Sequence, residues 1–236
     1  MTIKMSSWQY PTDFPQLLSG QVHLWRFSLD ALPVTYENLR ALLSADELAR
    51  ADRLLDPLKC HNFTIARGHL RRLLANYLDL APEEIDFSYN VSGKPFVATK
   101  NSSGLTFNLS HSGSRAILAV AMNAEVGVDI EKVDFDLNFH LLAARYFSPM
   151  EFVALKGFST IRQRRQFYRI WTCKEAVLKM IGSGFSSPEP VGTVSQNCCV
   201  INTFFAVNYV SAVVIDRKIT AILKFNLSPD EGISPR

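Results

Sequence analysis

Residues 167–184 read FYRIWTCKEAVLKMIGSG and form the most informative segment of this 236-residue chain. At about 100° per residue, Lys174, Glu175 and Lys179 share one side of a helix with Trp171. The other side is apolar and carries Ile170, Cys173, Val177, Met180 and Ile181. This pattern predicts an amphipathic helix whose charged side faces a cleft, where it can hold a metal and a phosphate together. A surface ion pair between Glu175 and Lys179 is the plainer alternative.

The composition is that of an ordinary globular protein, but the charge is unevenly spread. The chain is 47% hydrophobic and 20% charged, with a formal net charge of +3. Residues 145–180 contain eight Lys or Arg against Glu151 and Glu175, a local charge of +6, so the remainder is about −3. This asymmetry points to an acidic partner near the segment, while a solvated helix face is the alternative.

The sequence carries no recognisable targeting or membrane signal. Residues 1–8 lack an apolar signal-peptide core, and no apolar run approaches the ~18 residues of a membrane span. The four cysteines have no metal-binding spacing, and adjacent Cys198 and Cys199 would form a strained bridge, so we expect reduced thiols. We therefore expect a cytoplasmic monomer without a nucleic-acid or membrane partner.

Alternation and helical spacing divide the chain into strands and helices. Strands are expected at 22–27, 105–110, 116–122, 126–131, 203–209 and 219–225, and helices at 44–53, 63–78, 140–147 and 167–181. Ser44 with Glu47, and Ser148 with Glu151, have the spacing of capping boxes at helix starts. Residues 186–190 are expected to end the helical region, and residues 228–236 to form a frayed tail.

The strand VGVDIE, residues 126–131, turns two carboxylates to one side. Strict alternation puts Asp129 and Glu131 on the same face as Gly127, ~6.6 Å apart along the strand. Such a pair can bind Mg²⁺, which keeps waters and phosphate oxygens beside one or two carboxylates. A solvated strand face is the alternative. The strands at 105–110, 116–122 and 126–131 are expected to form an antiparallel meander, which brings His111 to the same end as the carboxylates.

Two further segments offer ligand contacts. FNLSHS, residues 107–112, puts a histidine and small hydroxyls at a strand end, where they can meet a ligand or serve as a structural turn. Gly93-Lys94-Pro95 is a rigid turn with a protruding cation, or an ordinary surface loop.

These segments occur in the order found in Sfp-type 4'-phosphopantetheinyl transferases, and the chain resembles that family over about residues 44–185. The matching motifs are Gly93-Lys94-Pro95, FNLSHS at 107–112, VGVDIE at 126–131, FSPME at 147–151 and WTCKEA at 171–176, followed by Lys179. The segments VHLWR at 22–26 and SADELAR at 44–50 also resemble cyanobacterial members.

The resemblance implies an α+β fold of two similar α/β halves, residues 1–124 and 125–236, related by pseudo-twofold symmetry and built on mostly antiparallel sheets. It also implies a reaction that moves the phosphopantetheine arm of coenzyme A to a serine of an acyl, polyketide or peptidyl carrier protein, releasing 3',5'-ADP. Mg²⁺, or Mn²⁺, would be the cofactor. The acidic surface of such a carrier would give the +6 segment its partner.

The family's functional residues fall on defined positions of this chain. The implied metal ligands are Asp129, Glu131 and Glu175. The implied catalytic residues are Glu175, a base for the incoming serine, and Lys179. The implied coenzyme A contacts are Lys59, Gly93, Lys94, Pro95, Ser110, His111, Lys174 and Lys179.

One segment departs from the family pattern, and two other functions remain open. In the family, an arginine-rich run at this place helps hold the 3'-phosphate of coenzyme A, and here KCHNF at 59–63 stands in its place. Lys59 and His61 are the candidate substitutes for the arginines. The choice between coenzyme A and dephospho-coenzyme A is therefore open. The carboxylates would also suit a metal-dependent phosphohydrolase acting on water. An inactive carrier-binding module is a third possibility, against which the intact carboxylates and lysines argue.

Overall fold

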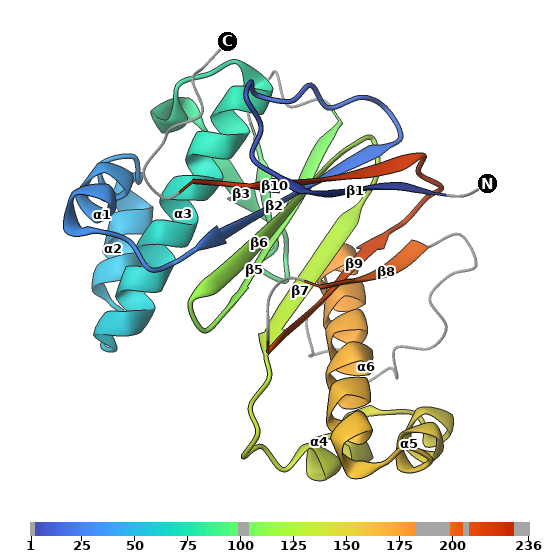
Figure 1. Cartoon of the computed structure of the whole chain (residues 1–236). Helices are drawn as coiled ribbons and strands as arrows, with labels where there is room; N and C mark the ends of the chain where they lie inside the picture. Colours follow the sequence, from blue (N-terminus) through green and yellow to red (C-terminus); the bar gives the residue numbers. More distant parts are fainter. Residues whose placement is uncertain (1–2, 99–103, 183–198, 205–207, 229–236) are drawn as a thin grey trace.

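The computed structural model describes residues 3–98, 104–182, 199–204 and 208–228 (Figure 1). Its helices are α1 (Pro33–Arg40), α2 (Ala45–Asp52), α3 (Pro57–Leu78), α4 (Phe139–Tyr146), α5 (Pro149–Lys156) and α6 (Thr160–Ile181), with a 3-10 turn at Pro82–Glu84. Its strands are β1 (Lys4–Gln9), β2 (Gln21–Ser28), β3 (Phe87–Tyr89), β4 (Pro95–Val97), β5 (Leu105–Ser112), β6 (Arg115–Met122), β7 (Val126–Lys132), β8 (Cys199–Phe204), β9 (Tyr209–Ile215) and β10 (Ala221–Asn226). Within these ranges, no helix is long and apolar enough to cross a membrane.

The same succession of elements occurs twice along the chain. In the first half, β2, two eight-residue helices and the 22-residue α3 precede the antiparallel strand pair β5–β6. In the second half, β7, two eight-residue helices and the 22-residue α6 precede the antiparallel pair β8–β9. The strand order is β2-β6-β5 in the first instance and β7-β9-β8 in the second. The α+β fold of two similar halves is therefore confirmed.

The five-stranded sheet also includes a strand from the end of the chain. β10 lies between β1 and β2 and is parallel to both, whereas the β2–β6 and β5–β6 pairs are antiparallel. Residues 221–226 thus cross from the second half into the first sheet. The division at residues 124 and 125 stays a prediction.

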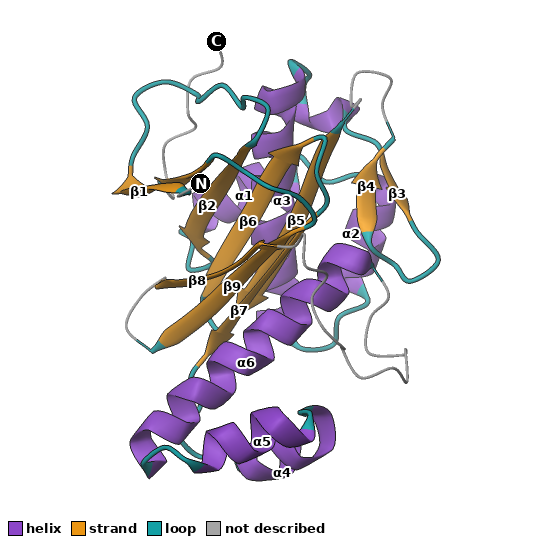
Figure 2. Ribbon diagram, turned by 90° about the vertical axis from the view of Figure 1, so that its right-hand side faces the viewer, coloured by secondary structure: helices purple, strands orange, loops and turns teal. Residues whose placement is uncertain are grey.

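Alternation along the strands builds a four-layered molecule, with α3 and α6 on the outside and the two sheets between them (Figures 1 and 2). On β2, Trp25 and Phe27 belong to the core shared with α3, whereas Val22 and Leu24 belong to the core between the sheets. The apolar residues of β7, Val126, Val128 and Ile130, lie in that central core. The opposite face of β7 is therefore left to α6.

Two strand predictions were wrong. β7 does not extend a meander with β6 but pairs antiparallel with β9, because the alternation of a strand shows its faces and not its neighbour. The strand expected at 203–209 is two strands, since β8 ends at Phe204 and β9 begins at Tyr209. The residues expected to end the helical region, 186–190, and nearly all of the predicted tail lie outside the described residues.

Both long helices begin earlier than their apolar spacing indicated. The α3 helix starts at Pro57, where the carboxylate of Asp56 accepts a hydrogen bond from the backbone N–H of Leu58 at 2.9 Å. This start brings Lys59 into the first turn of α3. The α6 helix starts at Thr160, so its first turns contain the arginine-rich segment.

Helix α3 is fastened to the first sheet by a buried polar cluster. The Tyr77 hydroxyl accepts from the indole N–H of Trp25 at 2.7 Å and lies 2.7 Å from Nδ1 of His23. Since a hydroxyl has one proton, the simplest arrangement has Tyr77 donating to an uncharged His23. Burial lowers the pKa of His23 to about 4, and burial followed by the charge of Arg72 lowers that of His69 to about 3.

These two histidines predict a loss of stability in mild acid. The unfolded chain binds protons near pH 6.5 and the folded chain does not, so the free energy of unfolding should fall as the pH drops from 7 towards 4, by up to about 1.4 kcal/mol per pH unit for each group. Urea unfolding at several pH values measures this slope. His23→Gln should flatten it, whereas replacing the exposed His140 by Gln should leave it unchanged. Equal slopes in all three proteins would contradict the assignment.

Candidate active site

Asp129 is the most deeply buried carboxylate of the predicted site. Its residue is 2% exposed, and its Oδ1 accepts from Nζ of Lys179 at 2.6 Å and from the hydroxyl of Ser110 at 3.0 Å. Its Oδ2 is also buried but has no hydrogen-bond partner among the described residues. Burial raises the pKa of Asp129, and Lys179 and Ser110 oppose that shift. One side of this carboxylate is therefore satisfied, and the other still lacks a proton or cation.

Glu131 lies two residues further along the same face of β7, as predicted. Its Oε2 accepts from the hydroxyl of Ser112 at 2.8 Å, and the indole of Trp171 provides a second hydrogen bond. Burial, followed by the charge of Asp129, raises its pKa. The tryptophan of the WTCKEA motif thus contacts the carboxylate pair from α6.

Glu175 faces the pair from α6. Burial, followed by the charges of Asp129 and Glu131, raises its pKa to about 7, while the charge of Lys179 opposes this shift. A carboxyl group with this pKa exchanges its proton readily at neutral pH. The structure therefore brings together the three predicted carboxylates and Lys179.

The charge of this cluster suits a divalent cation. Three carboxylates face the ammonium of Lys179, and in the described part of the chain the buried Oδ2 of Asp129 has no hydrogen-bond partner. The described residues contain no ready-made cage of three or more His, Cys, Asp or Glu ligands. Mg²⁺ commonly needs only one or two carboxylates because waters and substrate phosphates complete its shell, so the residues fit this ion.

Lys174 pairs with a carboxylate outside this cluster, that of Glu151 in α5. Its Nζ is 3.0 Å from Oε2 of Glu151, and the residue is buried. The same Glu151 carboxylate accepts from the backbone N–H of Ser148 at 2.7 Å, which confirms the predicted capping box at the start of α5. The sequence predicted only this capping role for Glu151, because helical spacing does not show that its carboxylate also pairs with Lys174.

Ser110 and His111 lie at the end of β5 beside the cluster. The Ser110 hydroxyl contacts both Asp129 and Lys179, with Nζ of Lys179 at 2.8 Å. His111 keeps an exposed face, but neighbouring protein atoms displace enough water to lower its pKa, and the charge of Lys179 lowers it further. Since the flanking Ser110 and Ser112 contact Asp129 and Glu131, His111 lies at the same end as these carboxylates, as predicted, although β5 and β7 are not joined by a meander.

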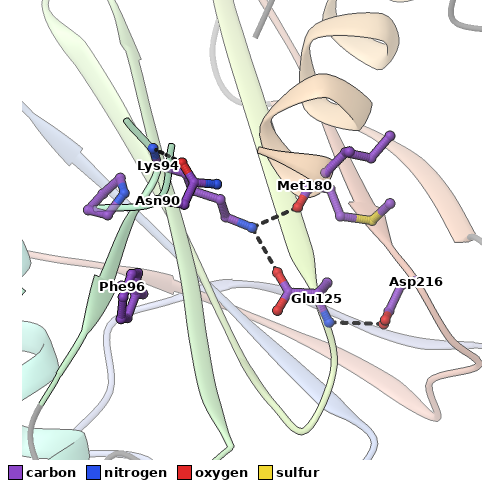
Figure 3. Close-up of a pocket in the computed structure, with 8 residues that line it drawn as sticks. Asn90, Lys94, Phe96, Glu125, Met180 and Asp216 are labelled. Carbon is purple, nitrogen blue, oxygen red and sulfur yellow. Dashed lines mark hydrogen bonds and ion pairs between the residues drawn. The ribbon is translucent and has the colours of Figure 1, made fainter. Parts of the chain in front are cut away.

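The Gly93-Lys94-Pro95 turn lies at the C-terminal end of α6, beside a pocket of about 430 Å³ (Figure 3). Gly93 has a φ of +83°, a conformation that favours glycine. Nζ of Lys94 donates to the backbone oxygen of Met180 at 2.7 Å and lies 2.8 Å from Oε2 of Glu125. The pocket is lined by Asn90, Lys94, Pro95, Phe96, Glu125, Met180, Ile181 and Asp216.

The first turn of α3 approaches the β5–β6 turn. The side-chain amide of Asn62 donates to the backbone oxygen of Gly113 at 3.3 Å. Nε2 of His61 lies 3.0 Å from the backbone oxygen of Leu29, and its ring stacks on Tyr36. Lys59 is exposed in the first turn of α3. Of the two predicted substitutes for the arginine-rich run, His61 therefore already serves the fold.

Comparisons with known proteins agree with this geometry. Residues 125–205 match the 4'-phosphopantetheinyl transferase superfamily, and residues 30–123 match the family described as 4'-phosphopantetheinyl transferase, N-terminal. The chain is 41% identical over 176 residues to the 4'-phosphopantetheinyl transferase HetI of Nostoc, a match that covers 74% of each chain.

Two other relatives give the same result. A putative 4'-phosphopantetheinyl transferase of Synechocystis is 35% identical over 147 residues, which is 62% of this chain and 60% of the relative. A 4'-phosphopantetheinyl transferase of Bacillus subtilis is 30% identical over 155 residues, 64% of this chain and 66% of the relative. The chain therefore belongs to the 4'-phosphopantetheinyl transferase superfamily, as a 4'-phosphopantetheinyl transferase similar to cyanobacterial members.

Proposed function

We propose that this enzyme moves the 4'-phosphopantetheine arm of coenzyme A to a serine of an acyl, polyketide or peptidyl carrier protein, with Mg²⁺ as cofactor. The observation that supports this best is the cluster of Asp129, Glu131 and Glu175 around Lys179. Transfer of a phosphoryl group needs positioning and charge neutralisation more than a protein nucleophile. The cluster is suited to both.

The proposed reaction is a displacement at phosphorus. The serine oxygen bonds to the phosphorus next to pantetheine, the bridging P–O bond breaks, and 3',5'-ADP leaves with the electron pair. Glu175 accepts the serine proton on its carboxylate. Asp129, Glu131 and Glu175 would hold Mg²⁺, which when bound neutralises the charge of the pyrophosphate. Lys179 orients a pyrophosphate oxygen by its ammonium.

We propose that the other predicted contacts hold the remainder of coenzyme A. The pocket beside Gly93, Lys94 and Pro95 has apolar side chains, among them Phe96, which suit a flat base. Its carboxylates, Glu125 and Asp216, disfavour a phosphate there. Ser110 and His111, which lie at the end of β5 beside the carboxylates, are further contacts in this proposal.

Two lysines remain as phosphate contacts. Lys174 is proposed for the pyrophosphate, where it would exchange its bond to Glu151 for one to the substrate. Lys59 is proposed for the 3'-phosphate, because it is exposed in the first turn of α3 while His61 is held by Leu29 and Tyr36.

We propose that the carrier binds at the first turns of α6. Arg162, Arg165 and Arg169 are exposed there, and their spacing of three and four residues puts them on one face. Arg164 has a different role, since its guanidinium donates to the backbone oxygens of Asp134 and Leu137 at 2.7 and 3.0 Å. An acidic carrier surface would therefore meet three arginines rather than the four in the segment.

The first test removes the charge of single carboxylates. Asp129→Asn and Glu175→Gln should each lower transfer by roughly 100-fold or more, because they weaken the electrostatic stabilisation of the transition state. Mass spectrometry of a carrier detects the added phosphopantetheine, and Mn²⁺ titration followed by electron paramagnetic resonance reports metal binding. Glu37→Gln changes an exposed carboxylate on α1 and is the control.

The same assay separates the alternatives. Release of 3',5'-ADP without a carrier would indicate hydrolysis, and an unmodified carrier that still binds would indicate an inactive binding module. Full transfer by a folded Asp129→Asn or Glu175→Gln protein, or by the metal-stripped enzyme, would contradict the metal assignment.

The second test reverses charge on the exposed arginines. Arg162→Glu together with Arg165→Glu should raise the KM for the carrier by about 10-fold or more at low salt, flatten its salt dependence, and leave coenzyme A binding unchanged. Lys4→Glu with Arg53→Glu changes the net charge equally at two exposed sites on the first half and is the control. Equal carrier kinetics in the two double variants would place the carrier elsewhere.

A further inference from the structure

Side chains of β5, rather than its backbone, bind the backbone of β7. The backbone N–H groups of Val128, Ile130 and Lys132 donate to side-chain oxygens of alternate β5 residues. The acceptors are Oδ1 of Asn108 at 2.9 Å, the Ser110 hydroxyl at 3.3 Å and the Ser112 hydroxyl at 3.1 Å. These three contacts, called here the polar ladder, join a strand of each sheet.

Two rungs of the polar ladder also touch the carboxylates. The Ser110 hydroxyl donates to Asp129 at 3.0 Å, and the Ser112 hydroxyl donates to Glu131 at 2.8 Å. A hydroxyl has one proton and two lone pairs, so each serine can accept from β7 and donate to a carboxylate at once. An amide oxygen only accepts, and the Asn108 rung lies beside Gly127, which has no side chain.

We propose that Ser112 is a positioning residue that fixes the Glu131 carboxylate in its metal-binding orientation. The proposal rests on the metal site of the proposed function. Residues that hydrogen-bond a metal ligand hold it in the orientation that binding requires. Ser112 tests this more cleanly than Ser110, because Ser110 also contacts Lys179. Asn108 is the matched control, since it makes the same backbone contact without a carboxylate.

The experiment compares Ser112→Ala, Ser112→Thr and Asn108→Ala in the full chain. Mn²⁺ is titrated into each protein in the absence of coenzyme A, with unbound Mn²⁺ measured by electron paramagnetic resonance. Urea unfolding reports stability, and transfer to a carrier gives kcat and KM.

Ser112→Ala should weaken Mn²⁺ binding and lower kcat, each by about 10-fold, and Ser112→Thr, which retains a hydroxyl, should restore both. Asn108→Ala should reduce stability but leave Mn²⁺ affinity within about twofold, because its oxygen touches no carboxylate.

If Ser112→Ala bound Mn²⁺ as tightly as the unchanged protein, the positioning role of Ser112 would be overturned and the metal assignment would stand. Equal losses of Mn²⁺ affinity in Ser112→Ala and Asn108→Ala would also overturn the positioning role, since the ladder would then act only through the fold. An unchanged protein that binds no Mn²⁺ would overturn the metal assignment itself, and the positioning role with it.

Discussion

The close contact between α6 and β7 at Gly127 determines the rest of the site. A Cβ atom at this position would lie 2.5 Å from the backbone nitrogen of Met180 and 2.8 Å from its Cβ, so a larger residue would push the helix away. The same face of β7 presents Asp129 and Glu131, and the same helix presents Glu175 and Lys179. The close approach of the two backbones brings these side chains within reach of one another.

Three of the lysines predicted to contact coenzyme A, two on α6 and one near its C-terminal end, are each paired with a carboxylate. Lys94 lies within 2.8 Å of Glu125, Lys174 within 3.0 Å of Glu151, and Lys179 within 2.6 Å of Asp129. Each ammonium is thereby held in place before a ligand binds, which reduces the conformational entropy that binding must cost. In the proposed function, a phosphate at Lys174 or Lys179 competes with a carboxylate there, so the negative charge of the substrate matters as much as its shape.

The sequence predicted those features that depend on local periodicity and missed those that depend on partners. Alternation placed Asp129 and Glu131 on one face of β7, and helical spacing put Glu175 and Lys179 together, because both patterns follow from backbone geometry alone. The pairing of β7 with β9 could not be predicted, since the faces of a strand do not identify its neighbour. The resemblance to the family, rather than periodicity, predicted the two similar halves.

The contacts of Ser112 were missed for a related reason. The strand was expected to end at residue 110, before Ser112, and the bonds of Ser110 and Ser112 to β7 depend on how the two sheets meet. Lys174 was predicted on the charged side of α6 and is instead buried against Glu151 in the first turn of α5, a helix that lies beside α6 (Figure 2). Tertiary packing therefore decides which charged residues of an amphipathic helix face a ligand.

The most direct measurement replaces Gly127 by Ala and compares it with Gly157→Ala. Gly157 follows α5 at a φ of −71°, and an added Cβ would lie 3.4 Å from the backbone oxygen of Ala154, so this change should be tolerated. Gly127→Ala should lower the free energy of unfolding by about 1–3 kcal/mol and abolish most carrier modification, because α6 has to move from β7. A Gly127→Ala protein with the stability and transfer activity of the unchanged enzyme would contradict the account.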